Sequence, residues 1–122
     1  MKEKIINIVL QQAELFLLDA NEFYPFGTCV NKKDEIIPVG AYLGGDHPES
    51  QALIDLLEKD FKEGIETGNY KIAALAIDIL IRKGNERYDG IEMRFFEPKG
   101  ISKRVYEYTI KEHSVEFVEY EE

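Results

Sequence analysis

The chain has 122 residues, 44% of them hydrophobic, which suffices for one domain over residues 1–122 with a substantial core. Its 24 acidic residues outnumber 15 basic ones, and a formal charge of -9 argues against binding to nucleic acid or to an anionic membrane. No apolar run approaches the ~20 residues of a membrane helix, and the only cysteine, Cys29, excludes an intrachain disulfide and fits a reducing cytoplasm.

The first half of the chain predicts two helices and two short strands. Apolar residues recur at helical spacing over residues 2–18, before Asn21. Strands are expected over residues 26–31 and 36–43, around a polar turn. A second helix is expected from about Pro48, which suits a first helical position, to a stop at Gly68. Its buried stripe repeats every fourth residue: Leu53, Leu57, Phe61 and Ile65.

The longest apolar run lies within residues 70–82, YKIAALAIDILIR, and Asp78 is the only charged residue between Ile72 and Ile81. Its alanines and leucines would suit a buried helix. Its isoleucines and the turn residues on both sides favour a strand, which is our prediction. Alternate side chains would then point to opposite faces. Both faces are too apolar for an ordinary solvated surface, so we expect a central strand.

Three more strands are expected over residues 91–97, 103–110 and 115–120, joined by short turns that imply antiparallel pairing. The order α-β-β-α-β-β-β-β predicts an α+β fold, a two-layer sandwich. It would have an antiparallel sheet of five or six strands with two helices on one face. The expected core is Leu53, Leu57, Phe61, Ile65, Leu75, Ile77, Ile79, Met93 and Phe95.

Three segments carry a resemblance: EFYPFG at residues 22–27, IPVGA at residues 37–41 and SQALI at residues 50–54. Together they resemble an uncharacterised family of small bacterial proteins of about this length. The resemblance spans most of the chain and implies no activity, so it transfers no catalytic residue. The element order also resembles profilin-like and roadblock-type domains, which are binding modules, although the last strand is additional.

Asp78 is the ionisable group most in need of explanation. A carboxylate that is buried without a partner is costly, and its pKa rises. In a functional interpretation Asp78 is a general acid or base in a cleft, with Tyr24 or His47 beside it. The structural interpretation, which we favour, pairs Asp78 with Arg94, Arg82 or a tyrosine hydroxyl on the same face.

Other polar groups predict no further chemistry. Residues 46–49, Asp-His-Pro-Glu, hold three potential ligands, but a helix-capping loop is the simpler interpretation, and we expect no metal and no cofactor. Cys29 with His47 or His113 would make a nucleophile and a base. No motif surrounds Cys29, so we expect a buried, inert thiol. The aromatic residues at 23, 24 and 26 are interpreted as core and loop packing.

The predicted function rests on the second face of the strand at residues 70–82. Two helices that cover one face of a sheet would leave the other for a partner, and a second copy is the commonest partner. We therefore predict a non-catalytic, cytoplasmic, protein-binding module that forms a homodimer. Ala76→Arg should weaken this dimer while the monomer still folds. The expected interface is Ile72, Ala74, Ala76, Leu80 and Phe96.

Two alternatives remain open at this point. One is a small enzyme with Asp78 as its acid or base. The other is an acidic antagonist of the immunity type, which masks a basic partner. An apolar pocket lined by several ionisable groups would favour the enzyme, whereas a broad apolar face or groove would favour the binding module.

Overall fold

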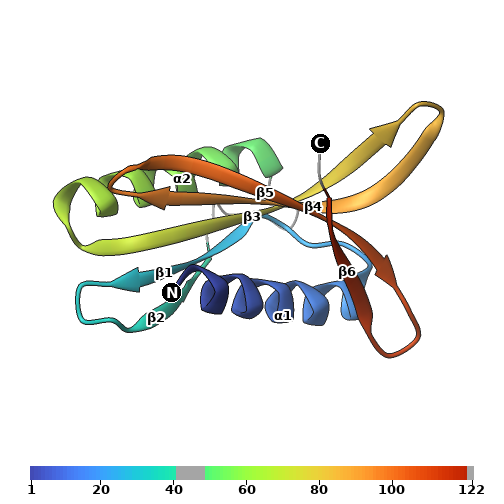
Figure 1. Ribbon diagram of the computed structural model, residues 1–122, viewed down its shortest axis with the longest axis horizontal. Helices are drawn as coiled ribbons and strands as arrows, with labels where there is room; N and C mark the ends of the chain where they lie inside the picture. The colour runs from blue at the N-terminus through green and yellow to red at the C-terminus, as the bar shows by residue number, and fades with distance from the viewer. Residues whose placement is uncertain (41–48, 121–122) are drawn as a thin grey trace.

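A computed structural model describes residues 1–40 and 49–120. Within them, helices α1 (Lys2–Ala20) and α2 (Ser50–Thr67) accompany a six-stranded sheet in the order β2-β1-β3-β4-β5-β6, with every neighbouring pair antiparallel (Figure 1). The predicted α+β class and element order are confirmed. The strands are β1 (Phe26–Asn31), β2 (Ile36–Val39), β3 (Tyr70–Lys83), β4 (Glu86–Glu97), β5 (Gly100–Ile110) and β6 (Val115–Tyr120).

The second helix ends at Gly68 as predicted, and the first runs to Ala20, two residues beyond the predicted range and directly before Asn21. Asn21 and Gly68 adopt left-handed backbone conformations, with φ of 62° and 81°, and each backbone N–H donates to a carbonyl of the last helical turn. Glycine and asparagine tolerate this conformation better than other residues, which explains why the helices stop here. The expected helix start at Pro48 and the expected end of the second strand at residues 41–43 lie outside the described residues.

The apolar run at residues 70–82 forms the central strand β3, as predicted. Its alternate side chains enter two separate cores. The α1 core lies between α1 and the sheet, and it includes Ile5, Val9, Ala13, Leu17, Ile72, Ala74, Ala76, Met93 and Phe95. The α2 core lies on the other side, and it includes Ile54, Leu57, Phe61, Ala73, Leu75, Ile77 and Phe96.

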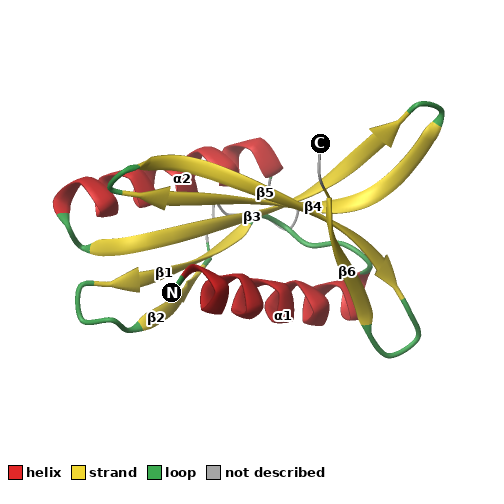
Figure 2. Ribbon diagram, viewed as in Figure 1, coloured by secondary structure: helices red, strands yellow, loops and turns green. Residues whose placement is uncertain are grey.

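The two cores place the helices on opposite faces of the sheet (Figure 2). The expectation that both helices share one face is corrected by this packing. Ala74 and Ala76 have short side chains, which lets α1 lie close against β3 and bury a face that water would solvate poorly. The expected single core is accordingly divided: Met93 and Phe95 belong to the α1 core, and Ile65 and Ile79 are only partly buried.

The residues expected at a dimer interface are mostly interior. Ile72, Ala74 and Ala76 are at most 4% exposed because α1 covers them. Phe96 pairs in register with Ala73 and is buried beneath α2, on the opposite face. Only Leu80 is exposed, at 48%. Neither α1 nor α2 is long and apolar enough to cross a membrane.

Candidate functional site

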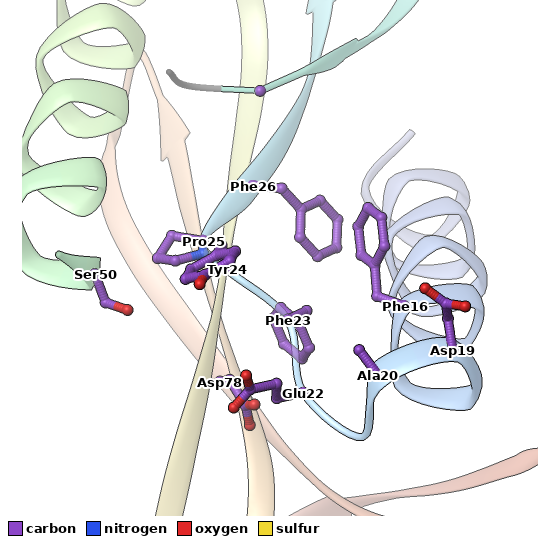
Figure 3. A pocket seen from close by; sticks show the side chains of 11 residues that line it. Phe16, Asp19, Ala20, Glu22, Phe23, Tyr24, Pro25, Phe26, Ser50 and Asp78 are labelled. Atoms are coloured by element: carbon purple, nitrogen blue, oxygen red, sulfur yellow. The ribbon is translucent and has the colours of Figure 1, made fainter. Parts of the chain in front are cut away.

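A cavity of about 460 Å³ opens at the C-terminal end of α1, where the chain passes from α1 to β1 (Figure 3). Its volume falls within the ~300–1,000 Å³ typical of ligand pockets. We call it the α1 pocket. It is lined by Phe16, Asp19, Ala20, Glu22, Phe23, Tyr24, Pro25, Phe26, Gly40, Ser50 and Asp78.

One wall of the α1 pocket is aromatic. The rings of Phe23 and Phe26 meet edge to face with centroids 5.5 Å apart, and Phe16 meets Phe26 in the same way at 5.3 Å. Phe23 and Phe26 are also buried in the α1 core, which confirms the predicted packing role of these two residues and holds the wall in place. Tyr24 is 47% exposed and stands at the rim (Figure 3).

Asp78 supplies the polar side of the pocket from the middle of β3. The Tyr108 hydroxyl donates a hydrogen bond of 2.8 Å to Asp78 Oδ1, and the backbone N–H of Phe23 also donates to this carboxylate. Burial raises the pKa of the Asp78 carboxyl above its ordinary value, and these two hydrogen bonds oppose the rise. The nearby carboxylates of Asp89 and Glu22 raise the pKa further.

Tyr108 is a stable donor to Asp78. Burial raises the pKa of the Tyr108 hydroxyl, and the bond to Asp78 raises it again, so the hydroxyl stays protonated at neutral pH. Of the three partners considered for Asp78, which were Arg94, Arg82 and a tyrosine hydroxyl, the structure shows the tyrosine. The alternative partner Arg94 faces α2 instead, where it pairs with Glu58 and Glu92.

The charges around the pocket are unbalanced. Asp19, Glu22 and Asp78 line it, and Asp89 lies close enough to influence Asp78. None of the eleven lining residues carries a positive charge. Across residues 1–40 and 49–120, none of these four carboxylates forms an ion pair.

Tyr24 and Asp78, two of the three predicted catalytic candidates, line the same cavity. The third, His47, lies outside the described residues, as does most of the potential ligand segment at residues 46–49. No group of three possible metal ligands was found in the part of the chain that the structure describes.

Cys29 is buried in the α2 core, as predicted. Burial raises the pKa of its thiol, which disfavours the reactive thiolate. His113 is exposed in the turn between β5 and β6 and cannot act on a thiol enclosed beneath α2. The structure therefore gives no support to a pairing of Cys29 with His113, which the sequence analysis had set aside in favour of an inert thiol.

Sequence reasoning missed the contribution of the end of α1. Phe16, Asp19 and Ala20 line the pocket only because α1 lies on the same face as Asp78. The available signal was the aromatic segment EFYPFG at residues 22–27, directly after a predicted helix end. Sequence analysis had associated Tyr24 of this segment with Asp78, but it did not place the end of α1 beside them.

Comparisons of this chain with protein-family models, curated proteins and solved structures found no match. The resemblance of residues 22–27, 37–41 and 50–54 to a small bacterial family therefore stays a prediction. The likeness of the element order to profilin-like and roadblock-type domains also stays a prediction.

Proposed function

We propose that this protein binds a small molecule in the α1 pocket, with Asp78 as the polar anchor. The observation that carries the proposal is the combination of an aromatic wall and a half-buried carboxylate in one cavity of about 460 Å³. Ligand pockets typically combine apolar walls with a few positioned polar groups. Ionisable groups with perturbed pKa values also cluster at functional sites.

Acid–base catalysis by Asp78 is a second candidate function. Its raised pKa brings proton exchange closer to neutral pH than for an ordinary aspartate, which suits a general acid or base. Tyr24 lines the same cavity. The pocket meets the criterion that we stated for an enzyme, since several ionisable groups line an apolar cavity. We still rank binding first because the described lining holds no thiol, imidazole or amine to share a reaction with Asp78.

The other hypotheses have less support. The homodimeric binding module rested on an open apolar face, and α1 covers that face. The acidic antagonist is supported by the charge of -9 alone. A cytoplasmic location remains part of the proposal, and the free, buried thiol of Cys29 supports it.

Filling the cavity tests the proposal. Ala20→Trp puts an indole into the pocket, whereas Leu15→Trp adds the same group at an exposed position of α1 outside the lining. Saturation-transfer NMR would detect binding of three one-ring probes that differ in charge: phenethylamine, 2-phenylethanol and 3-phenylpropionate. We expect contact signals for wild type and Leu15→Trp and their loss in Ala20→Trp. Equal signals in all three proteins, or none in wild type, would overturn the proposal.

A further inference from the structure

The α1 pocket carries negative charge that no described cation balances. Asp19 reaches it from α1, Glu22 from the connection between α1 and β1, and Asp78 from β3. Asp89 of β4 adds to the field at Asp78. Like charges that share a partly desolvated site repel each other, so a ligand that supplies positive charge removes an unfavourable interaction as it binds.

The helix ends at the pocket do not change this balance. Ala20 belongs to the last turn of α1, whose terminus has about half a negative charge. Ser50 is the first residue of α2, whose terminus has about half a positive charge. Both residues line the cavity, and the two contributions oppose each other. The side-chain carboxylates therefore determine the charge that the pocket prefers.

Asp78 has acceptor capacity left for a ligand. An ionised carboxylate offers about four lone-pair sites. The Tyr108 hydroxyl and the Phe23 backbone N–H use part of this capacity. Both protein partners donate to Asp78 and hold it in the form that accepts hydrogen bonds. A ligand group that donates N–H bonds fits the remaining sites.

The aromatic residues favour the same class of ligand. Phe16, Phe23 and Phe26 offer an apolar wall for a ring or a short hydrocarbon chain. Tyr24 stands at the rim, where it presents an aromatic group to an incoming ligand (Figure 3). Aromatic faces attract ammonium groups through the negative potential above the ring.

We propose that the ligand of the α1 pocket is a small organic amine in its protonated form. Its apolar part lies against the phenylalanine wall, and its ammonium group donates to Asp78. This inference rests on the proposed function, because it names the class of molecule that the same pocket binds.

Three probes of nearly equal size test the charge preference. Phenethylamine is cationic at neutral pH, 2-phenylethanol is neutral, and 3-phenylpropionate is anionic. Isothermal titration calorimetry with wild-type protein should give phenethylamine at least a tenfold lower Kd than 2-phenylethanol, with no measurable binding of 3-phenylpropionate. Tenfold is the smallest ratio expected for one hydrogen bond to a charged group.

Matched variants assign the preference to the pocket. Asp78→Asn should raise the Kd of phenethylamine about tenfold or more and leave that of 2-phenylethanol nearly unchanged. Glu58→Gln makes the same change in net charge on the opposite face of the sheet, and it should leave both values unchanged. Tyr24→Ala should weaken phenethylamine binding between about twofold and thirtyfold, whereas Tyr24→Phe should keep it.

The outcomes separate this inference from the proposed function. If 2-phenylethanol or 3-phenylpropionate binds as tightly as phenethylamine, and Ala20→Trp abolishes that binding, the pocket is a ligand site but the amine assignment is wrong. If Glu58→Gln weakens phenethylamine as much as Asp78→Asn does, the preference comes from net charge and the assignment is also wrong. If no probe binds to wild type, both proposals fail.

Discussion

Two carboxylate sites on opposite faces of the sheet differ in how their charge is balanced. On the α2 side, Glu58 and Glu92 both pair with the guanidinium of Arg94, with 2.5 Å between Arg94 Nε and Glu92 Oε2. On the α1 side, Asp78 receives hydrogen bonds from Tyr108 and from the Phe23 backbone but forms no ion pair within residues 1–40 and 49–120. The carboxylates around Arg94 are balanced by a described cation, whereas Asp78 forms no ion pair with a described residue.

This difference arises within a single strand. Alternate side chains of β3 lie on opposite faces of the sheet, so the residues of one face can differ from those of the other. The α1 core ends in the α1 pocket of about 460 Å³, whereas the cavity beside Ile65 and Phe96 of the α2 core has about 250 Å³. The comparison shows that a partly buried carboxylate without an ion pair among the described residues, beside a cavity, distinguishes the candidate site from the paired carboxylates near Arg94.

The largest expected effect comes from a charge placed in the α1 core. Ala76→Arg buries a guanidinium under α1 without a partner, so we expect a loss of several kcal/mol or failure to fold, which reverses the sequence-based expectation. Leu80→Arg on the same side of β3 is the control, with a change within about 0.5 kcal/mol because Leu80 is exposed. Urea unfolding followed by circular dichroism would measure both. Equal stability of the two variants would contradict burial by α1.

The next largest effect on stability is expected in the α2 core. Phe61 is fully buried, and its ring lies 5.7 Å from that of Phe96, so Phe61→Ala should cost about 3–5 kcal/mol. Tyr24→Ala in the α1 pocket should cost less than about 1 kcal/mol because Tyr24 is half exposed. Denaturation midpoints would compare the two. A larger loss at Tyr24 would mean that the pocket residues chiefly stabilise the fold.

A smaller effect is expected where Tyr108 meets Asp78. Tyr108→Phe removes a buried donor and leaves the carboxylate short of one hydrogen bond, at a cost of about 1–3 kcal/mol. Tyr88→Phe is the control, since its exposed hydroxyl donates to the exposed Glu86, and its effect on stability should be much smaller. Thermal unfolding would measure this difference, and equal effects would argue that Tyr108 does not support Asp78.

The smallest expected effects have opposite signs on the two faces. Glu58→Gln breaks a partly exposed ion pair and should cost about 0.2–1 kcal/mol at neutral pH. Asp78→Asn keeps an acceptor for Tyr108 and removes a charge that the fold disfavours, so it should stabilise the protein at neutral pH.

The pH dependence of this gain has a defined direction. The pKa of Asp78 is raised in the folded protein, so native Asp78 binds protons more tightly than the unfolded chain does. Wild-type stability therefore falls as pH rises from the unfolded pKa, about 3.9, through the folded value. The advantage of Asp78→Asn should be full at neutral pH and shrink on acidification. If melting curves show that Asp78→Asn is less stable than wild type at neutral pH, the claim that the charge of Asp78 destabilises the fold is contradicted.

The sequence predicted the elements of this fold because their signals are local. Asn21 and Gly68 closed helices, and the β-branched run at residues 70–82 formed a strand. It did not predict which helix covers which face. Alternation in β3 shows that both faces are apolar, and the assignment of α1 depends on packing between distant segments.

The candidate site was predicted only in part, because it also depends on packing between distant segments. Asp78 was identified from its apolar neighbours alone. Its partner required the register of β3, β4 and β5, because a slip of one residue moves Arg94 from one face to the other. The pocket needed the end of α1 beside β3, which no local pattern encodes.

The most direct test of the central claim is the titration of the Asp78 carboxyl carbon, followed by NMR with and without phenethylamine. Tyr108, Glu22, Asp89 and Asp19 face this region from β5, the connecting segment, β4 and α1. We expect the free protein to titrate above the ordinary value of about 3.9, and saturating amine to lower the midpoint, because a bound cation stabilises the ionised carboxylate. A midpoint at or below the ordinary value, or one that the amine leaves unchanged, would contradict the claim that Asp78 binds the ammonium group of a cationic ligand.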